Sequence, residues 1–156
     1  RNNGLHAGKA PGEVETMKIL VPVDGSAFSR RLLAWLAAHE EWVQGGHAFT
    51  LLFVNQPVPP RPASVLDKSV LTAHYADTAE RVFKPIRRFF AKQSVAARYE
   101  TLVGPVAETI AKTAEKGGYD LVMIGSHGHG ALLNLVLGSV ATKVLAGCKV
   151  PVLVIR

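Results

Sequence analysis

The chain has 156 residues, of which 48% are hydrophobic and 19% are charged, a size and composition typical of one globular domain. No apolar run is long enough for a membrane span, so we expect no membrane association. The 18 Lys and Arg against 12 Asp and Glu give a net charge of +6, which favours anionic ligands in general but lacks the block of like charge of a nucleic-acid-binding arm. The single cysteine, Cys148, excludes an intramolecular disulfide framework, and no secretion signal opens the chain, so we expect a cytoplasmic protein.

The first sixteen residues carry three glycines and a proline without any hydrophobic period. We therefore interpret residues 1–16 as a disordered arm or an expression remnant, and residues 17–156 as the domain. Met17 is the expected native start.

Five apolar runs rich in β-branched residues alternate with helical stretches after Met17. This alternation predicts a parallel sheet flanked by helices, built by four right-handed crossovers, and not a β-sandwich. The predicted strands are 18–23, 48–54, 96–103, 121–124 and 150–155. The predicted helices are 26–43 with Ser26 as its cap, 69–92, 105–117 and 138–145.

A proline-rich stretch separates the second strand from the second helix. Residues 56–63 contain four prolines in eight positions, which is incompatible with regular structure and predicts a loop. Two interpretations stay open at this point, an inert surface connection and a flap over a neighbouring pocket.

The segment 121–140 runs from a strand through a glycine-rich loop into a helix. Glycines at 125, 128 and 130 leave room for backbone N–H groups to converge on one anion. Gly138 and Ser139 then open a helix whose amino end attracts the same negative charge, with the Ser139 hydroxyl as a further donor. The alternative is that the glycines only shape a turn and that Ser139 only caps its helix.

Two common phosphate-binding sequences are absent. No Gly-x-x-x-x-Gly-Lys-Ser/Thr occurs in the chain, which excludes a P-loop enzyme. A dinucleotide fingerprint should follow the first strand, but there the chain reads Val23-Asp24-Gly25-Ser26, which argues against NAD or FAD.

The spacing of Gly125, Gly128, Gly138 and Ser139 resembles the universal stress protein family, whose ATP-binding members carry Gly-x2-Gly-x9-Gly-Ser/Thr at this point. The resemblance covers residues 17–156. It includes Val21-Pro-Val-Asp-Gly-Ser26 at the first strand, Gly104-Pro105 after the third, and Val150-Pro-Val-Leu-Val154 at the end.

The resemblance implies a Rossmann-like fold of the adenine nucleotide alpha hydrolase type: one open parallel five-stranded sheet in the order 3-2-1-4-5 with helices on both faces. Ligands of such sheets bind at the switch point, here between the first and fourth strands. The family pattern implies ATP with Mg²⁺ as the ligand, with Asp24 near the adenosine and Val54 offering backbone contacts to adenine. Asp24 could also simply shape its turn, and the two roles can coexist. The implied site is Pro22, Val23, Asp24, Val54, Gly104, Gly125, Ser126, His127, Gly128, His129, Gly130, Gly138, Ser139 and Val140.

Two further features suggest functions that we set aside. His127 and His129 lack a carboxylate or cysteine at metal-ligand spacing, so we expect no metal site and interpret them as solvated loop residues or phosphate contacts. The predicted helix 69–92 carries five Lys and Arg residues between 81 and 92, for which a solvated surface is a commoner explanation than nucleic-acid binding.

Three classes of function are compatible with these features. The resemblance favours a binding module whose nucleotide state regulates partners in a stress response, with little or no ATP turnover. A slow ATPase or autophosphorylating enzyme is the first alternative, although we find no catalytic residue, no committed base and no arginine finger. A nucleotide-free interaction protein that keeps the loop as scaffold is the second.

We also expect a homodimer that is joined through the last strand. In the implied order this strand is an edge, and residues 150–155 are apolar and uncharged, whereas a solitary edge normally carries charge or cover. Pairing about a two-fold axis through Val150, Val152 and Val154 satisfies this edge, as the family resemblance also implies.

Overall fold

The computed structural model describes residues 16–59, 67–129 and 137–156. Its core is one five-stranded sheet in the order β3-β2-β1-β4-β5, with all neighbouring strands parallel. The strands are β1 (Lys18–Pro22), β2 (Ala48–Asn55), β3 (Ala97–Val103), β4 (Leu121–Gly125) and β5 (Val152–Ile155). The predicted fold class and strand order are confirmed.

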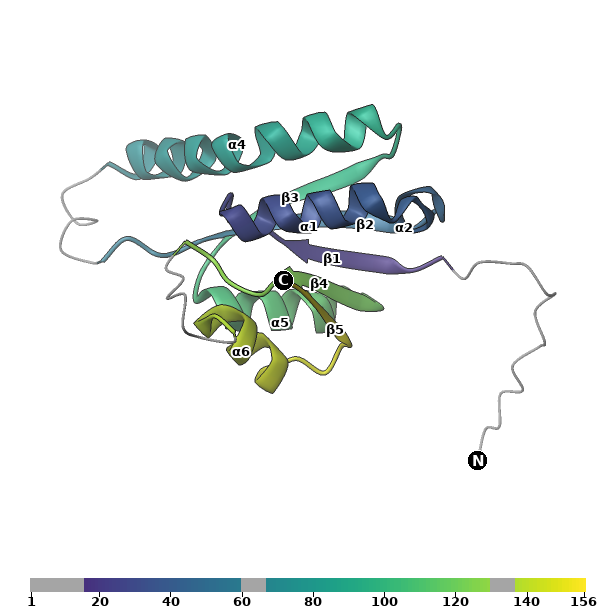
Figure 1. Ribbon diagram of the computed structural model, residues 1–156. Coiled ribbons are helices and arrows are strands. Elements are labelled where there is room, and N and C mark those ends of the chain that lie inside the picture. Colours follow the sequence, from purple (N-terminus) through teal and green to yellow (C-terminus); the bar gives the residue numbers. More distant parts are fainter. Residues whose placement is uncertain (1–15, 60–66, 130–136) are drawn as a thin grey trace.

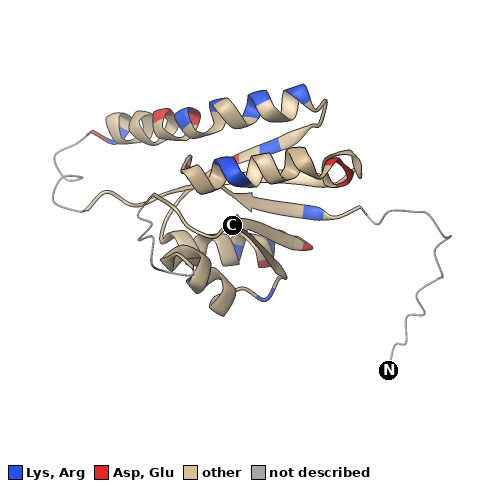
Figure 2. Cartoon of the chain, viewed as in Figure 1, with Lys and Arg blue, Asp and Glu red and all other residues tan. Residues whose placement is uncertain are grey.

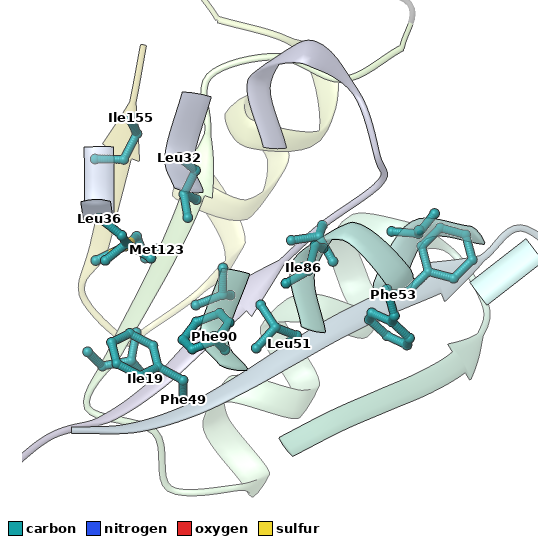
Figure 3. Packing of buried hydrophobic residues seen from close by; sticks show 14 of the residues in the cluster. Ile19, Leu32, Leu36, Phe49, Leu51, Phe53, Ile86, Phe90, Met123 and Ile155 are labelled. Atoms are coloured by element: carbon teal, nitrogen blue, oxygen red, sulfur yellow. The ribbon is translucent and has the colours of Figure 1, made fainter. Parts of the chain in front are cut away.

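Helices cover both faces of the sheet (Figure 1). They are α1 (Ala27–Ala38), α2 (Glu40–Gln44), α4 (Lys68–Lys92), α5 (Val106–Lys116) and α6 (Ser139–Gly147). One core lies between the sheet and α1, α2 and α4, and Figure 3 shows its large side chains, including Phe49, Phe90 and Met123. The other core lies between the sheet and α5 and α6 and contains Leu52 and Ile110. Alternate residues of each strand enter opposite cores, as the two-residue period of a strand requires.

The predicted helix 26–43 is wrong in one respect, because the structure divides it at His39. The backbone there has φ −122° and ψ 70°, outside the helical region. The ring of His39 stacks on Trp35 at 4.1 Å, and its Nδ1 donates to the Trp35 carbonyl at 2.8 Å. The side chain thereby takes an acceptor that the backbone N–H of His39 would use in a continuous helix, and this N–H turns to Leu36 instead.

The other differences are at element boundaries. The last strand begins at Val152 and not at residue 150, since Pro151 has no N–H to contribute to a ladder. The long helix begins at Lys68, where Asp67 accepts the Ser69 N–H, and it accommodates Pro85. Ser26 caps α1 as predicted, because its side chain accepts the Ser29 N–H. The interpretation of residues 1–16 as an arm stays a prediction, since residues 1–15 lie outside the described residues.

None of the described Lys, Arg, Asp and Glu residues is buried, and Figure 2 shows their positions along the chain. Lys and Arg follow one another along α4, where Arg81 and Arg87 pair with Asp77 and Glu80 at 2.9 and 3.5 Å. None of the helices in the described part of the chain is long and apolar enough to cross a membrane.

The connections of β1 and β4 create a crevice. The chain leaves β1 into α1 on one face of the sheet and leaves β4 for α6 on the other. The carboxyl ends of these two neighbouring strands are therefore not covered by a helix from either face, which is where ligands of open α/β sheets bind.

Candidate functional site

A cavity of about 520 Å³ lies at the carboxyl ends of β1 and β4, within the range of about 300–1,000 Å³ that small-molecule sites occupy. Eleven of the predicted site residues line it together: Pro22, Val23, Asp24, Val54, Gly125, His127, Gly128, His129, Gly138, Ser139 and Val140. They come from β1, β2, the loop after β4 and the start of α6. The structure thus brings together segments that are more than one hundred residues apart in the chain.

Two predicted site residues, Gly104 and Ser126, do not line the cavity. Gly104 is buried after β3, where its N–H donates to the Asn55 carbonyl at 3.0 Å and an added Cβ would lie 2.7 Å from Thr109 Oγ1. Ser126 is buried behind the loop, with its N–H bonded to the Ile155 carbonyl at 2.7 Å. Neither is among the residues that line the cavity. Gly130 lies outside the described residues.

Seven further residues that the sequence analysis missed line the cavity: Ser29, Leu52, Gln56, Val106, Ile110, Ile124 and Ala141. Leu52 and Ile124 could have been found, because the two-residue period places them on the same face as Val54 and Val122. Val106 and Ile110 carry no such signal. Gln56 belongs to the proline-rich loop, whose residues 60–63 lie outside the described part, so the flap interpretation stays a prediction.

Asp24 is held firmly at the end of β1. Its Oδ1 accepts the Ser26 N–H at 2.9 Å and the Ser29 hydroxyl at 2.8 Å. Burial alone would raise the pKa of this carboxyl, but the hydrogen bonds from Ser26 and Ser29 and the nearby His129 imidazole outweigh it, so the pKa lies below its usual value. Asp24 therefore both shapes its turn and presents an ionised carboxylate at the cavity.

The loop after β4 is fixed against β1 and α1. His129 Nε2 donates to the Asp24 backbone carbonyl at 2.7 Å, and the His127 ring packs on Phe28 with centroids 4.8 Å apart. The Ser126 hydroxyl pairs with His127 Nδ1 at 3.0 Å. Both histidines thus take part in holding the loop in place, beyond the solvated role that the sequence suggested.

The glycines of the loop are needed for packing as well as for open space. An added Cβ at Gly125 would lie 3.0 Å from Phe28 Cβ, and one at Gly138 would lie 3.1 Å from His127 Cα. At Gly128 it would lie 2.6 Å from Asp24 Oδ2. The Gly138 N–H donates to the Ser126 carbonyl at 2.8 Å, which closes the loop.

The amino end of α6 opens onto the cavity. Gly138 is its N-cap, so the alternative that Ser139 caps this helix is wrong, and no side chain of the described residues makes a cap hydrogen bond there. The N–H groups of residues 139–141 belong to the first turn, which has no intrahelical acceptors. These groups and the helix dipole favour an anion at this position.

Ionisable groups are few around the cavity. Among its described lining residues there is one carboxylate, Asp24, two histidines, and no lysine or arginine. In the described ranges no group of three or more His, Cys, Asp or Glu side chains could hold a metal ion. An anion in this cavity would thus meet backbone dipoles and histidines in place of fixed cations.

Residues 15–156 match the model of the universal stress protein family. The chain belongs to this family. The match spans all five strands and the complete lining of the cavity.

Named relatives agree with this family assignment. The chain is 29% identical to the stress response protein NhaX of Bacillus subtilis, over 89% of this chain and 97% of NhaX. It is 28% identical to universal stress protein Slr1230 of Synechocystis, over 94% of this chain but only 45% of that protein. The chain therefore spans less than half the length of this second relative.

Solved structures share the fold. Protein MJ0577 of Methanocaldococcus jannaschii superimposes with a TM-score of 0.74 at 28% identity, over 89% of this chain and 94% of that one. A universal stress protein of Archaeoglobus fulgidus, solved in complex with dAMP, superimposes with a TM-score of 0.60 at 20% identity, over 90% and 98%. Another universal stress protein, solved with cAMP, has a TM-score of 0.65 at 16% identity, over 91% and 99%.

Gly125→Ala tests the packing role of the loop glycines. The new methyl group would press on Phe28 Cβ at 3.0 Å and on the Phe28 backbone at 3.2 Å, and such overpacking costs about 1–3 kcal/mol. We expect a free energy of unfolding lower by that amount in denaturant titrations. Gly147→Ala is the matched control, since no atom lies within 4 Å of its added Cβ, and equal stability of the two variants would contradict this account.

Proposed function

We propose that this universal stress protein binds an adenine nucleotide, with ATP and its Mg²⁺ counter-ion as the ligand, and acts in the cytoplasm as a nucleotide-dependent regulatory module. One observation carries the proposal: a single cavity joins an apolar wall to a glycine loop and a helix amino end. A nucleotide has the same division into a flat, largely apolar base and an anionic tail.

The apolar wall fits the base. Val54, Val106, Ile110 and Ile124 line the cavity, and burying apolar surface on them supplies about 25 cal/mol per Å². These side chains extend the core between the sheet, α5 and α6, so this wall exists before any ligand arrives.

The backbone N–H and C=O of Val54 can also form hydrogen bonds with the edge of the base. The ladder between β1 and β2 ends where Val23 N–H meets the Leu52 carbonyl at 2.9 Å. In a parallel ladder the N–H and C=O of alternate residues point to the same neighbour, so those of Val54 point to the space beyond β1. This pair of groups suits the donor and acceptor edge of adenine.

The polar end of the cavity fits phosphate. The first turn of α6 offers N–H groups without intrahelical partners, and the loop Gly125–His129 passes beside it. Two proteins of the same fold were solved with dAMP and with cAMP, which supports an adenine nucleotide as the kind of ligand. In this proposal the ATP phosphates lie between the loop and α6, with Mg²⁺ balancing their charge.

A valine at Gly128 tests the proposed site. The new side chain would begin 2.6 Å from Asp24 Oδ2 and would fill the space that the phosphates need, so we expect ATP binding in calorimetry to fall by at least about 100-fold. Gly147→Val is the control, because its surroundings are open. Unchanged affinity in a folded Gly128→Val protein would sink the proposal.

We expect ATP to be held with little or no turnover. Phosphoryl transfer needs a group that orients the acceptor and cations that neutralise the developing charge, and the described lining supplies no lysine or arginine. Phosphate release by the purified protein should thus stay near background. Several turnovers per minute that disappear in Gly128→Val would instead favour the slow ATPase or autophosphorylating enzyme.

We further propose that the protein is a homodimer joined through β5. The two edge strands of the sheet, β3 and β5, differ in charge. Strand β3 carries Arg98 and Glu100, whereas β5 (Val152–Ile155) carries no charged residue. Val150, Val152 and Val154 are only partly buried within one chain. A second copy that pairs with β5 would satisfy its free backbone groups and cover these side chains.

Light scattering of an edge-charged variant tests the dimer. Val152→Lys/Val154→Lys should be monomeric, because each lysine would have to lose its hydration in the interface. Thr101→Lys/Val103→Lys makes the equivalent change on the opposite edge strand and should stay dimeric, with circular dichroism confirming that both are folded. A monomeric wild type would show that the edge is protected in another way.

A further inference from the structure

We propose that Ser29 is a positioning residue of the nucleotide site, whose hydroxyl orients the Asp24 carboxylate so that Asp24 Oδ2 faces the hydrogen-bond donors of the ligand. The inference rests on the proposed nucleotide function and assigns a role to a residue of α1, a helix that supplies none of the expected site residues.

Ser29 is bonded to Asp24 at two points. Its hydroxyl donates to Asp24 Oδ1 at 2.8 Å and accepts the Asp24 backbone N–H at 3.1 Å. The side chain lines the cavity, yet the residue is only 7% exposed. Its own backbone N–H is bonded to the Ser26 hydroxyl at 3.3 Å, so Ser29 is itself fixed in the first turn of the helix.

These contacts distinguish the two carboxylate oxygens of Asp24. Oδ1 accepts from both Ser26 and Ser29. Oδ2 lies on the side of Gly128, only 2.6 Å from the position that a Cβ there would occupy. The carboxylate is thus turned with one oxygen toward the start of α1 and the other toward Gly128, a residue of the loop that lines the cavity.

Asp24 is the only acidic side chain among the described residues that line this cavity. An ionised carboxylate accepts hydrogen bonds and cannot donate them, so Oδ2 selects a donor on the ligand. An adenine nucleotide offers two kinds, the ribose hydroxyls and the exocyclic amino group of the base. Both kinds can donate a hydrogen bond to Oδ2, and analogues that lack one or the other distinguish them.

Without its hydroxyl, residue 29 could no longer hydrogen-bond the carboxylate or the backbone N–H of Asp24. The carboxylate would keep the Ser26 N–H at 2.9 Å but would be free to turn, and the Asp24 N–H would lose its acceptor. A misplaced acceptor weakens ligand binding without removing the cavity, because the fixed geometry of the binding groups supplies part of the affinity.

The test measures AMP binding by calorimetry to the wild type, Ser29→Ala and Thr113→Ala. Thr113 is the matched control: its hydroxyl bonds to the Thr109 carbonyl at 2.7 Å on α5 and does not line the cavity. We expect Ser29→Ala to weaken AMP binding roughly tenfold, because the misoriented Asp24 Oδ2 would lose its charge-assisted hydrogen bond to the ligand, and Thr113→Ala to leave AMP binding unchanged.

Three analogues identify the donor: 2′-deoxy-AMP, 3′-deoxy-AMP and purine riboside monophosphate, which lacks the amino group. The analogue without the donor that Oδ2 reads should bind the wild type more weakly than AMP does. In Ser29→Ala this difference should shrink toward none, a coupling that a purely structural role of Ser29 would not produce.

Carbon-detected NMR of the Asp24 carboxyl supplies a readout that needs no ligand. The pKa of Asp24 should rise in Ser29→Ala, since a hydrogen bond to its charged form is lost, and should not move in Thr113→Ala. Wild-type AMP affinity in Ser29→Ala, or equal analogue ratios in the two proteins, would overturn this inference alone. If the wild type binds neither AMP nor ATP, the proposed function is overturned and this inference with it.

Discussion

The burial of β1 between two parallel neighbours is the constraint on which the rest of the structure depends. Its residues pair with β2 from Lys18 to Pro22 and with β4 at Ile19 and Leu20. Ile19, Leu20 and Val21 are fully buried, and they enter opposite cores in alternation. With both faces and both edges covered, the strand can meet solvent only at its two ends, and Asp24 follows its carboxyl end.

The site is therefore an extension of the core and not an addition to it. Part of the apolar wall consists of the last side chains of β2 and β4, whose earlier residues pack in the same cluster, such as Leu52 with Val54 and Val122 with Ile124, and Val106 and Ile110 of α5 complete it. The polar wall is fixed by short contacts: Phe28 against Gly125, Ser126 against Ile155, and His129 against Asp24. A site held in this way loses little conformational freedom when a ligand binds.

The net charge of the chain does not describe the charges around the cavity. The formal charge is +6, but lysines and arginines are carried mainly on outer surfaces, prominently along α4 (Figure 2). The cavity has Asp24, two histidines and the amino end of α6. An anion in this cavity would therefore meet a short-ranged and directional attraction.

The sequence by itself determined the fold class and predicted the location of the candidate site. Alternating strands and helices specify a parallel sheet, and the spacing of Gly125, Gly128, Gly138 and Ser139 carried the family resemblance from which the strand order and the crevice followed. These signals are local, because a strand's period and a loop's glycines are properties of a few consecutive residues. The structure confirms the strand order and brings eleven of the predicted site residues into one cavity.

Only the tertiary structure decided which other residues complete the cavity. Ile110 and Ser29 reach it because α5 and α1 pack on opposite faces of the sheet, and no pattern within either helix records that arrangement. The break at His39 differs, because the Trp35 carbonyl that its side chain contacts is only four residues earlier, so a local contact interrupts the helical pattern there. The contacts that complete the cavity join residues by position in space, and a periodicity along the chain carries no information about them.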